Sequence, residues 1–288
     1  MVRAPGTQFL STLGVVGAAY EAPEGAEASE YIDGRYAPGP DLPDPPGENP
    51  ALHVLVKFPH LAGVRSFRLG NPVTDQLEDS DQCHTDGTLA YHFLKQMPNV
   101  EEVYLLAHQV DAAKVYALPM PHLRVLMHYH GHDYPLERLA ANPTLTNLAQ
   151  LYCFPHGLES DDEPYLRLRQ LRAICRSPHL TGLTHLRLRA SDAGDGGAKE
   201  IVASGVLKRL KVLDLRYGCM SDAGARLLAG CPDLKNLEHL DLSDNALTAQ
   251  GIQALKATGV KLTATHMHTQ TGYDPDGDNE YLWMGDPE

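Results

Sequence analysis

The sequence repeats itself at a fixed interval toward its carboxyl-terminal end. Three consecutive segments, 180–207, 207–234 and 234–260, each begin with the pattern LxxLxxLxL and continue through a polar turn into an apolar stretch. The leucines that open LxL in these segments are 27 residues apart: Leu186, Leu213 and Leu240. Such a period indicates one strand–turn–helix unit per copy, and one unit cannot bury its apolar face alone. Neighbouring copies are therefore expected to stack into an α/β solenoid.

Weaker copies of the pattern extend toward the amino terminus. The LxL positions are filled there by Phe67 and Leu69, Val103 and Leu105, Leu126 and His128, and Leu151 and Cys153. From Phe67 onward, successive units are separated by 36, 23, 25, 35, 27 and 27 residues. The two long intervals contain acidic insertions, which we expect to be surface loops. Seven strands are therefore predicted, with a further terminal strand in the segment "VKLTATHMH".

The segment "LDLSDNAL" at residues 240–247 matches the LxLxxNxL core of a leucine-rich repeat. On these residues the chain resembles leucine-rich repeat proteins, in particular the long-repeat type of ribonuclease inhibitor and of bacterial repeat proteins. The resemblance implies a horseshoe with a parallel β-sheet on its concave side, helices on its convex side, and Asn245 bonded to backbone groups at the bend. It also implies a non-catalytic protein-binding module or, as in some relatives, a regulatory subunit of an enzyme or GTPase.

Three regions are expected along the chain. Residues 1–60 should form an amino-terminal cap and a proline-rich acidic segment, with an edge strand or cap in 51–58. Residues 61–262 should hold about seven leucine-rich repeats, and residues 263–288 a carboxyl-terminal cap and acidic tail. The mildly apolar residues 1–22 are interrupted by serine, threonine and glycine, so a weak signal peptide is the less favoured interpretation.

Residues that flank the inward leucines should project from the concave face. They form columns there, because parallel strands lie about 4.8 Å apart. The candidate partner-binding residues in these columns are Tyr104, Leu106, Met127, Tyr129, Tyr152, Phe154, Arg187, Arg189 and Arg216. Exposed apolar patches, and tyrosine and arginine within them, are typical of binding surfaces.

We expect this patch to hold a protein or peptide with an apolar segment followed by an acidic one. Tyr152→Asp or Phe154→Asp should then abolish binding while the protein still folds. The alternative is that the chain itself buries the patch.

The segment "VLMHYHGHDY" at 125–134 makes a metal site the alternative function. In the repeat register, His128 points into the core, and two more histidines follow it. A metal-binding protein of this kind would use His108, His130, His132 and His156, with their nitrogens about 2.0–2.1 Å from one ion. Because the spacing matches no established ligand pattern, the expectation is no metal and no cofactor.

The formal net charge of −13 disfavours nucleic acids and anionic membranes as partners, and no apolar stretch of about 20 residues is present. Five cysteines without a CxxC pair indicate a reducing compartment, so we expect a cytoplasmic protein. His239, Asp241 and Ser243 are the residue types of a hydrolase triad. However, alternate residues of a strand lie about 6.8 Å apart, too far for relayed hydrogen bonds. We therefore predict no enzyme activity.

Overall fold

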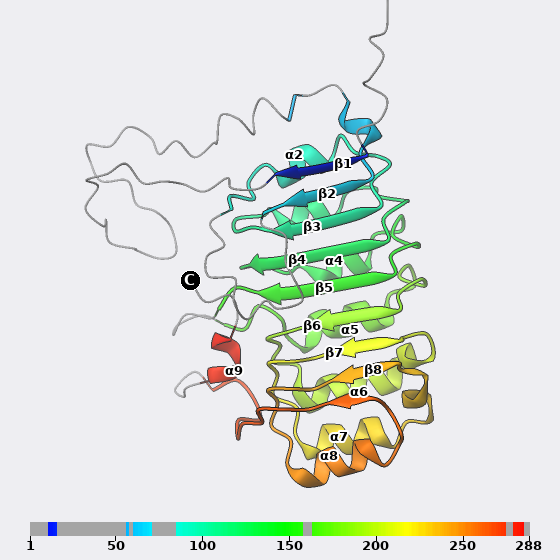
Figure 1. Ribbon diagram of the computed structural model, residues 1–288, viewed down its shortest axis with the longest axis vertical. Helices are drawn as coiled ribbons and strands as arrows, with labels where there is room; N and C mark the ends of the chain where they lie inside the picture. The colour runs from blue at the N-terminus through cyan, green and yellow to red at the C-terminus, as the bar shows by residue number, and fades with distance from the viewer. Residues whose placement is uncertain are drawn as a thin grey trace, which may run out of the picture.

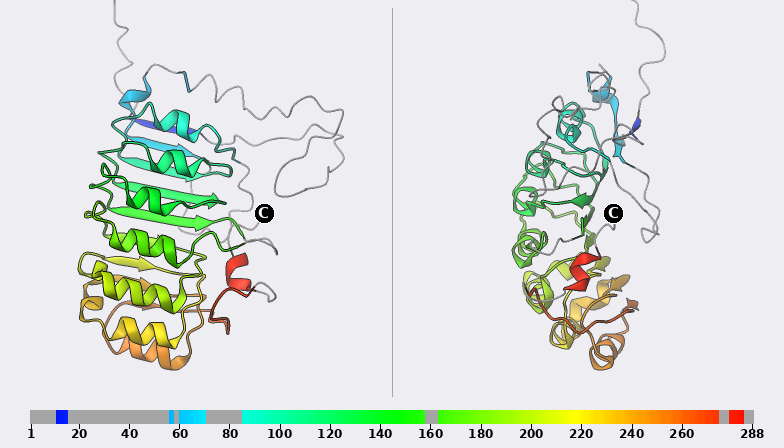
Figure 2. Two further views of the ribbon diagram at one scale, coloured as in Figure 1. Left: turned by 180° about the vertical axis from the view of Figure 1, so that it is seen from behind. Right: turned by 90° about the vertical axis from the view of Figure 1, so that its left-hand side faces the viewer.

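The computed structural model describes residues 11–15, 56–57, 60–70, 85–157, 163–274 and 279–284. Within these residues, nine parallel strands form a single sheet in the order in which they occur along the chain (Figure 1). Helices cover one side of the sheet, and the right-hand panel of Figure 2 shows strands and helices as two layers of a curved stack. The predicted α/β solenoid with a parallel sheet is therefore confirmed.

The strands pair in the register that the repeat predicts. They are β1 Thr12–Val15, β2 Ser66–Leu69, β3 Glu102–Leu106, β4 Val125–Gly131, β5 Gln150–Pro155, β6 His185–Leu188, β7 Val212–Asp214, β8 His239–Asp241 and β9 Leu262–Thr263. The first LxL positions are aligned from β2 to β8 and have no exposed surface: Phe67, Val103, Leu126, Leu151, Leu186, Leu213 and Leu240. The seven predicted strands and the terminal strand β9 are thus all present.

The edge of the sheet nearest the amino terminus is formed by a segment that the sequence did not single out as a strand. Strand β1 pairs in parallel with β2, and its Val15 is buried. The edge strand expected in 51–58 lies largely outside the described residues. Its two described residues, Val56 and Lys57, form a turn.

The two shortest repeats carry short helices. The helices are α2 Ala90–Leu94, α3 Ala112–Tyr116, α4 Leu136–Ala140, α5 Leu168–Arg176, α6 Gly194–Ser204, α7 Asp222–Ala229, α8 Ala249–Lys256 and α9 Glu280–Trp283, with 3-10 turns at Leu61–Gly63, Val206–Lys208 and Pro232–Asn236. The 23- and 25-residue intervals leave room for only the five-residue helices α3 and α4. In the later repeats, α6 has 11 residues and α7 and α8 have eight each.

Asn245 bonds the backbone at the bend after β8, as the resemblance implies. Its Oδ1 accepts from the Met220 N–H at 2.9 Å, and its Nδ2 donates to the Leu215 carbonyl at 2.8 Å. The side chain is 1% exposed. Buried backbone groups must find partners, so this asparagine stabilises the turn and ties it to the preceding repeat.

Four cysteines lie in the described part of the chain, and none of them is in a disulfide: Cys153, Cys175, Cys219 and Cys231. Burial raises the pKa of the Cys153 thiol, which occupies an inward LxL position. In the same part of the chain, no helix is both long and apolar enough to cross a bilayer.

Candidate functional site

The aromatic and apolar candidate residues lie side by side on strands β3, β4 and β5. Tyr104, Met127 and Tyr152 are register partners, and so are Leu106, Tyr129 and Phe154. Four of the six form a hydrophobic cluster separate from the main core, together with Ala190 and Tyr217. Tyr104 and Met127 pack against this cluster from the side.

The cluster is much less exposed than the sequence suggested. Leu106, Tyr129, Tyr152 and Phe154 have exposed fractions of 4, 1, 8 and 6%. The Tyr129 and Phe154 rings meet edge-to-face at 5.7 Å, and Phe154 stacks on Tyr217 at 5.6 Å. Large rings on strands only about 4.8 Å apart fill the space between one another. The expectation of an exposed patch is therefore wrong for these four side chains, although whether the patch binds a partner stays a prediction.

Tyr217 is a member of this cluster that the sequence analysis missed. It has a positive φ of 54°, and Ala190 and Asp244 have φ values of 50° and 55° at the same position in their repeats. This left-handed turn after the strand brings the Tyr217 ring onto Phe154. The shared position, four residues after the first LxL leucine, was visible in the sequence, but a left-handed conformation is rare for residues with a side chain.

The arginines of the predicted site are largely neutralised within the protein. Arg189 Nε donates to Asp214 Oδ2 at 3.1 Å, and Arg216 Nη2 donates to the same oxygen at 3.1 Å. Burial alone would raise the pKa of the Asp214 carboxyl, but the two guanidinium groups outweigh it and hold that pKa below its usual value. Arg216 also lies 3.5 Å from Asp241. These two arginines thus have less charge to offer an acidic partner than expected.

Two other arginines are stacked on tyrosines of the concave face. The Arg68 Cζ lies 4.3 Å from the centre of the Tyr104 ring, and the Arg187 Cζ lies 4.6 Å from that of Tyr152. Arg68 is exposed; the Arg187 side chain is 26% exposed, and its Nε lies 3.9 Å from Asp214 Oδ2. Tyr104 and Met127 are partly exposed. Arg68 on β2, Tyr104 on β3, Met127 on β4 and Arg187 on β6 all lie at the same position of the strand register. We call Arg68, Tyr104, Met127 and Arg187 the open row.

The residue types of a hydrolase triad on β8 have other partners. His239 Nε2 lies 2.8 Å from Thr263 Oγ1, and Ser243 Oγ lies 3.1 Å from Thr265 Oγ1. Asp241 Oδ1 accepts from the Ser243 backbone N–H at 3.0 Å rather than from an imidazole. These contacts give the histidine and serine structural roles.

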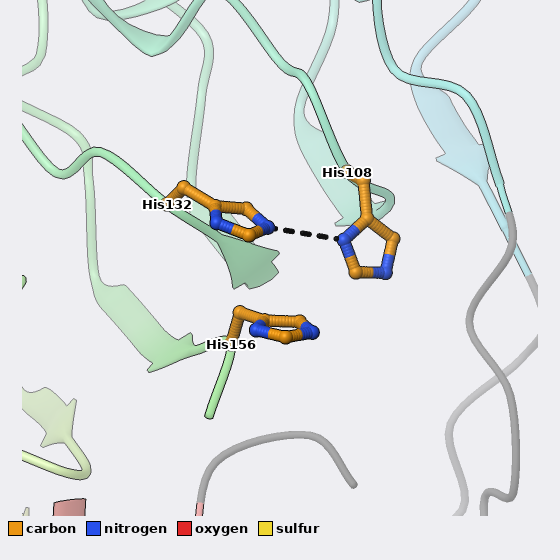
Figure 3. Close-up of side chains that lie close together, drawn as sticks. All are labelled: His108, His132 and His156. Carbon is orange, nitrogen blue, oxygen red and sulfur yellow. Dashed lines mark hydrogen bonds between the residues drawn. The ribbon is translucent and has the colours of Figure 1, made fainter. Parts of the chain in front are cut away.

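Three histidines come together just beyond the carboxyl ends of β3, β4 and β5 (Figure 3). His108 Nδ1 lies 3.3 Å from His132 Nε2, and His132 stacks on His156 with ring centres 4.5 Å apart. One ring nitrogen from each histidine lies within 4.8 Å of the other two. His108 and His156 are partly buried and His132 is exposed.

The four-histidine set of the alternative function is therefore reduced to three. His130 is 3% exposed and lies outside this group, although its ring is parallel to that of His108 at 5.8 Å. Its φ of 63° is the left-handed turn found four residues after the first LxL residue in other repeats, but the register between β4 and β5 shifts between Tyr129 and Gly131. This irregularity was not predictable from the repeat spacing. His128 points into the core, as predicted, and is fully buried.

Part of the chain matches a known protein family, and two solved structures are similar to it. A family model described as leucine-rich repeat matches residues 208–229 and 233–256. Among solved structures, the chain is similar to a structural-genomics target from Bacteroides fragilis, with 16% identity and a TM-score of 0.47 over 77% of this chain and 70% of that one. It is also similar to an internalin from Listeria monocytogenes, with 16% identity and a TM-score of 0.44 over 75% of this chain. The match covers 58% of the internalin chain, less than two thirds of its length. No curated protein matches the sequence.

The fold is a strand–helix repeat solenoid. Its defining features are a parallel sheet with the strands in chain order, buried LxL rows, and the asparagine at the bend. Two of its repeats match the family model directly, and the other strands continue the same register. The fold is therefore that of a leucine-rich-repeat solenoid.

Proposed function

We propose that the protein binds a protein or peptide partner through the concave face of its sheet and catalyses no reaction itself. The observation that carries this proposal is the open row, in which accessible guanidinium groups, a tyrosine and a methionine share one register position. Arginine and tyrosine are enriched at binding hot spots, and stacking on a ring holds the guanidinium in place before a partner arrives.

The open row also suggests the chemistry of the partner. Arg68 on β2 and Arg187 on β6 are four strand spacings apart, which is about 19 Å. An extended segment of about six residues spans that length. The row therefore suits an extended segment that carries acidic side chains near both ends and an apolar side chain between them, over Met127. This differs from the apolar-then-acidic order expected from the sequence, because Asp214 bonds Arg189 and Arg216 at 3.1 Å and approaches Arg187 only to 3.9 Å.

A matched pair of charge reversals tests the proposal. Arg68→Glu reverses an exposed charge in the open row, whereas Arg138→Glu reverses an exposed charge on α4, behind the sheet. Each variant and the wild type are immobilised and used to capture partners from a native lysate, with quantitative mass spectrometry. The proposal expects a defined protein captured by wild type and by Arg138→Glu but lost with Arg68→Glu. Equal capture by all three contradicts it.

We also propose a cytoplasmic location. The described cysteines are free thiols, and a reducing compartment keeps thiols in that state. Fractionation of cells that express the full chain tests this assignment, since recovery in an exported or membrane fraction contradicts it.

A further inference from the structure

We propose that His108, His132 and His156 together bind one divalent transition-metal ion, such as Zn²⁺, with water in the fourth position. Imidazole nitrogens suit Zn²⁺, Co²⁺, Ni²⁺ and Cu²⁺, and three protein ligands with one open position are a common arrangement for bound zinc. The site lies beyond the carboxyl ends of β3, β4 and β5 and shares no residue with the open row.

The repeat architecture explains how three histidines separated in sequence converge. His108 lies five residues after Val103, and His156 lies five residues after Leu151, so they hold equal positions beside β3 and β5. The equivalent residue after β4 is Gly131. The register shift before Gly131 lets β4 run one residue further, and His132 then reaches the space between its two neighbours.

The distances suit a tetrahedral ion. Ligands about 2.0–2.1 Å from a tetrahedral centre lie about 3.3–3.4 Å from one another. The 3.3 Å between His108 Nδ1 and His132 Nε2 already equals that edge. The largest separation in the group is bounded by 4.8 Å, so the third nitrogen has to approach by at most about 1.5 Å. Small rotations of the partly buried His108 and His156 side chains, together with the exposed His132, supply a movement of this size.

Backbone and carbonyl contacts hold the other two ligands in place. The His108 N–H donates to the Thr85 carbonyl at 2.9 Å, and the His156 N–H donates to the Gly131 carbonyl at 3.2 Å. His156 Nδ1 lies 2.8 Å from the Gly157 carbonyl, which can only accept, so the proton is on Nδ1. The lone pair of His156 is then on Nε2. A carbonyl in this role is the usual way in which proteins orient a metal-binding imidazole.

Charge favours a cation as the ligand. The chain carries a net charge of −13, which raises the local concentration of cations. The exposed His132 gives solvent access to the site, so that an ion can enter and a water molecule can complete the coordination. Without an ion, the same three imidazoles can hydrogen-bond to one another as neutral groups, as His108 and His132 do here.

Metal titration of the untagged full-length protein distinguishes these two states. The protein is stripped with a chelator, and Co²⁺ is added while its visible absorption is followed. Zn²⁺ is then added as a competitor. We expect one equivalent of Co²⁺ with a tetrahedral spectrum, displaced by one equivalent of Zn²⁺. Binding should weaken in acid, because protons compete with the metal for imidazole nitrogens.

Single substitutions assign the site. His108→Ala, His132→Ala and His156→Ala should each lower the affinity by about 100-fold or more, since two ligands remain. His122→Ala removes an exposed histidine outside the group and should leave the affinity unchanged. Wild-type affinity in His132→Ala, or Co²⁺ binding spread over several weak equivalents, overturns the proposal.

Thermal unfolding shows whether a variant loses metal binding because it has lost a ligand or because it is misfolded. His132 is exposed, so His132→Ala should melt at the wild-type temperature when no metal is present. Zn²⁺ should raise the melting temperature of the wild type and of His122→Ala but not that of His132→Ala, because an ion stabilises only the form that binds it. Equal stabilisation of all three proteins by Zn²⁺ contradicts the site.

Discussion

Asp222 accepts hydrogen bonds from both the backbone N–H and the hydroxyl of Thr248, at 2.9 and 2.6 Å. The same pair of bonds joins Asp195 to Ser221, 27 residues earlier, at 2.8 and 2.6 Å. Thr248 and Ser221 are the N-cap residues of α8 and α7. A carboxylate at the start of each helix therefore holds the start of the next one, so that neighbouring repeats are coupled through the first turns of their helices.

Removal of this coupling should destabilise the protein. Asp222→Ala deletes the bonds to Thr248 and the bond from the Gly251 N–H, and we expect a loss of about 1–2 kcal/mol in the free energy of unfolding. Urea denaturation measures it. Glu238→Ala removes an exposed carboxylate that pairs with Lys211 and should change stability by less than about 0.5 kcal/mol. Equal losses in the two variants contradict the coupling.

The coupling also has a pH dependence. The hydroxyl of Thr248 and two backbone N–H groups lower the pKa of Asp222 below its ordinary value of 3.8. The stabilisation is thus complete above pH 3.8 and is lost as the pH falls through the lower pKa of the folded state. The stability difference between wild type and Asp222→Ala should accordingly shrink in acid.

Two glycine-to-alanine substitutions should have opposite effects. A Cβ on Gly251 would lie 2.2 Å from Asp222 Oδ1, so Gly251→Ala has to displace the carboxylate. We expect a loss of about 1–3 kcal/mol, although alanine favours a helix more than glycine does. Gly230 has a helical φ of −74°, and a Cβ there meets nothing closer than 3.4 Å. Gly230→Ala should therefore be neutral or stabilising by up to about 1 kcal/mol in thermal unfolding.

His128 should make the protein sensitive to mild acid. Burial lowers the pKa of its imidazole from 6.5 to about 3. In the unfolded chain this imidazole takes up a proton near pH 6.5, whereas in the folded chain it stays neutral until the pH is near 3. The contribution of neutral His128 to the free energy of unfolding is therefore complete above pH 6.5 and is lost as the pH falls toward 3. At pH 5 the free energy of unfolding should be about 2 kcal/mol lower than above pH 6.5 because of this one group.

A double variant isolates this contribution. Tyr116 hydroxyl and His128 Nδ1 are 2.8 Å apart, so His128→Leu is combined with Tyr116→Phe to avoid an unpaired buried hydroxyl. Leucine is the residue at the equivalent position of β3 and β6. Urea unfolding between pH 7 and 5 should show a steeper loss in the wild type than in the double variant. Parallel profiles would show that His128 takes up a proton in the folded state.

The aromatic cluster should behave as core. Phe154→Asp places a carboxylate at a site that is 6% exposed and removes ring contacts with Tyr129 and Tyr217, so we expect a loss of about 3–5 kcal/mol. This reverses the expectation that such a variant folds normally. Met127→Asp, on the partly exposed neighbouring position, should cost less than about 1.5 kcal/mol. Comparable denaturation midpoints for the two variants would show that the cluster is an open surface.

The sheet register could be predicted from the sequence, whereas the state of its concave face could not. Leu186, Leu213 and Leu240 repeat at one interval, and a shift by one residue would turn all inward side chains outward, so the pattern allows one register. Exposure at Tyr129 depends instead on rings contributed by other strands. The left-handed turn at Tyr217 and the neutralisation of Arg189 by Asp214 likewise depend on three-dimensional contacts.

The histidine site was only partly predictable for the same reason. The repeat register brings His108 and His156 to equal positions on β3 and β5. Which histidine of the β4 repeat joins them is decided by the irregularity at Gly131, and it is His132 rather than His130.

The central claim is that the open row binds the partner, and hydroxyl-radical footprinting of the complex tests it most directly. Radicals oxidise methionine and aromatic side chains that solvent reaches, and Tyr104 and Met127 of the open row are partly exposed. Trp283 and Met284, which are 52% and 51% exposed, provide an internal reference in the carboxyl-terminal region. If the open row binds the partner, the partner should protect Tyr104 and Met127 from oxidation and leave the oxidation of Trp283 and Met284 unchanged. Undiminished oxidation of Met127 in a saturated complex would contradict it.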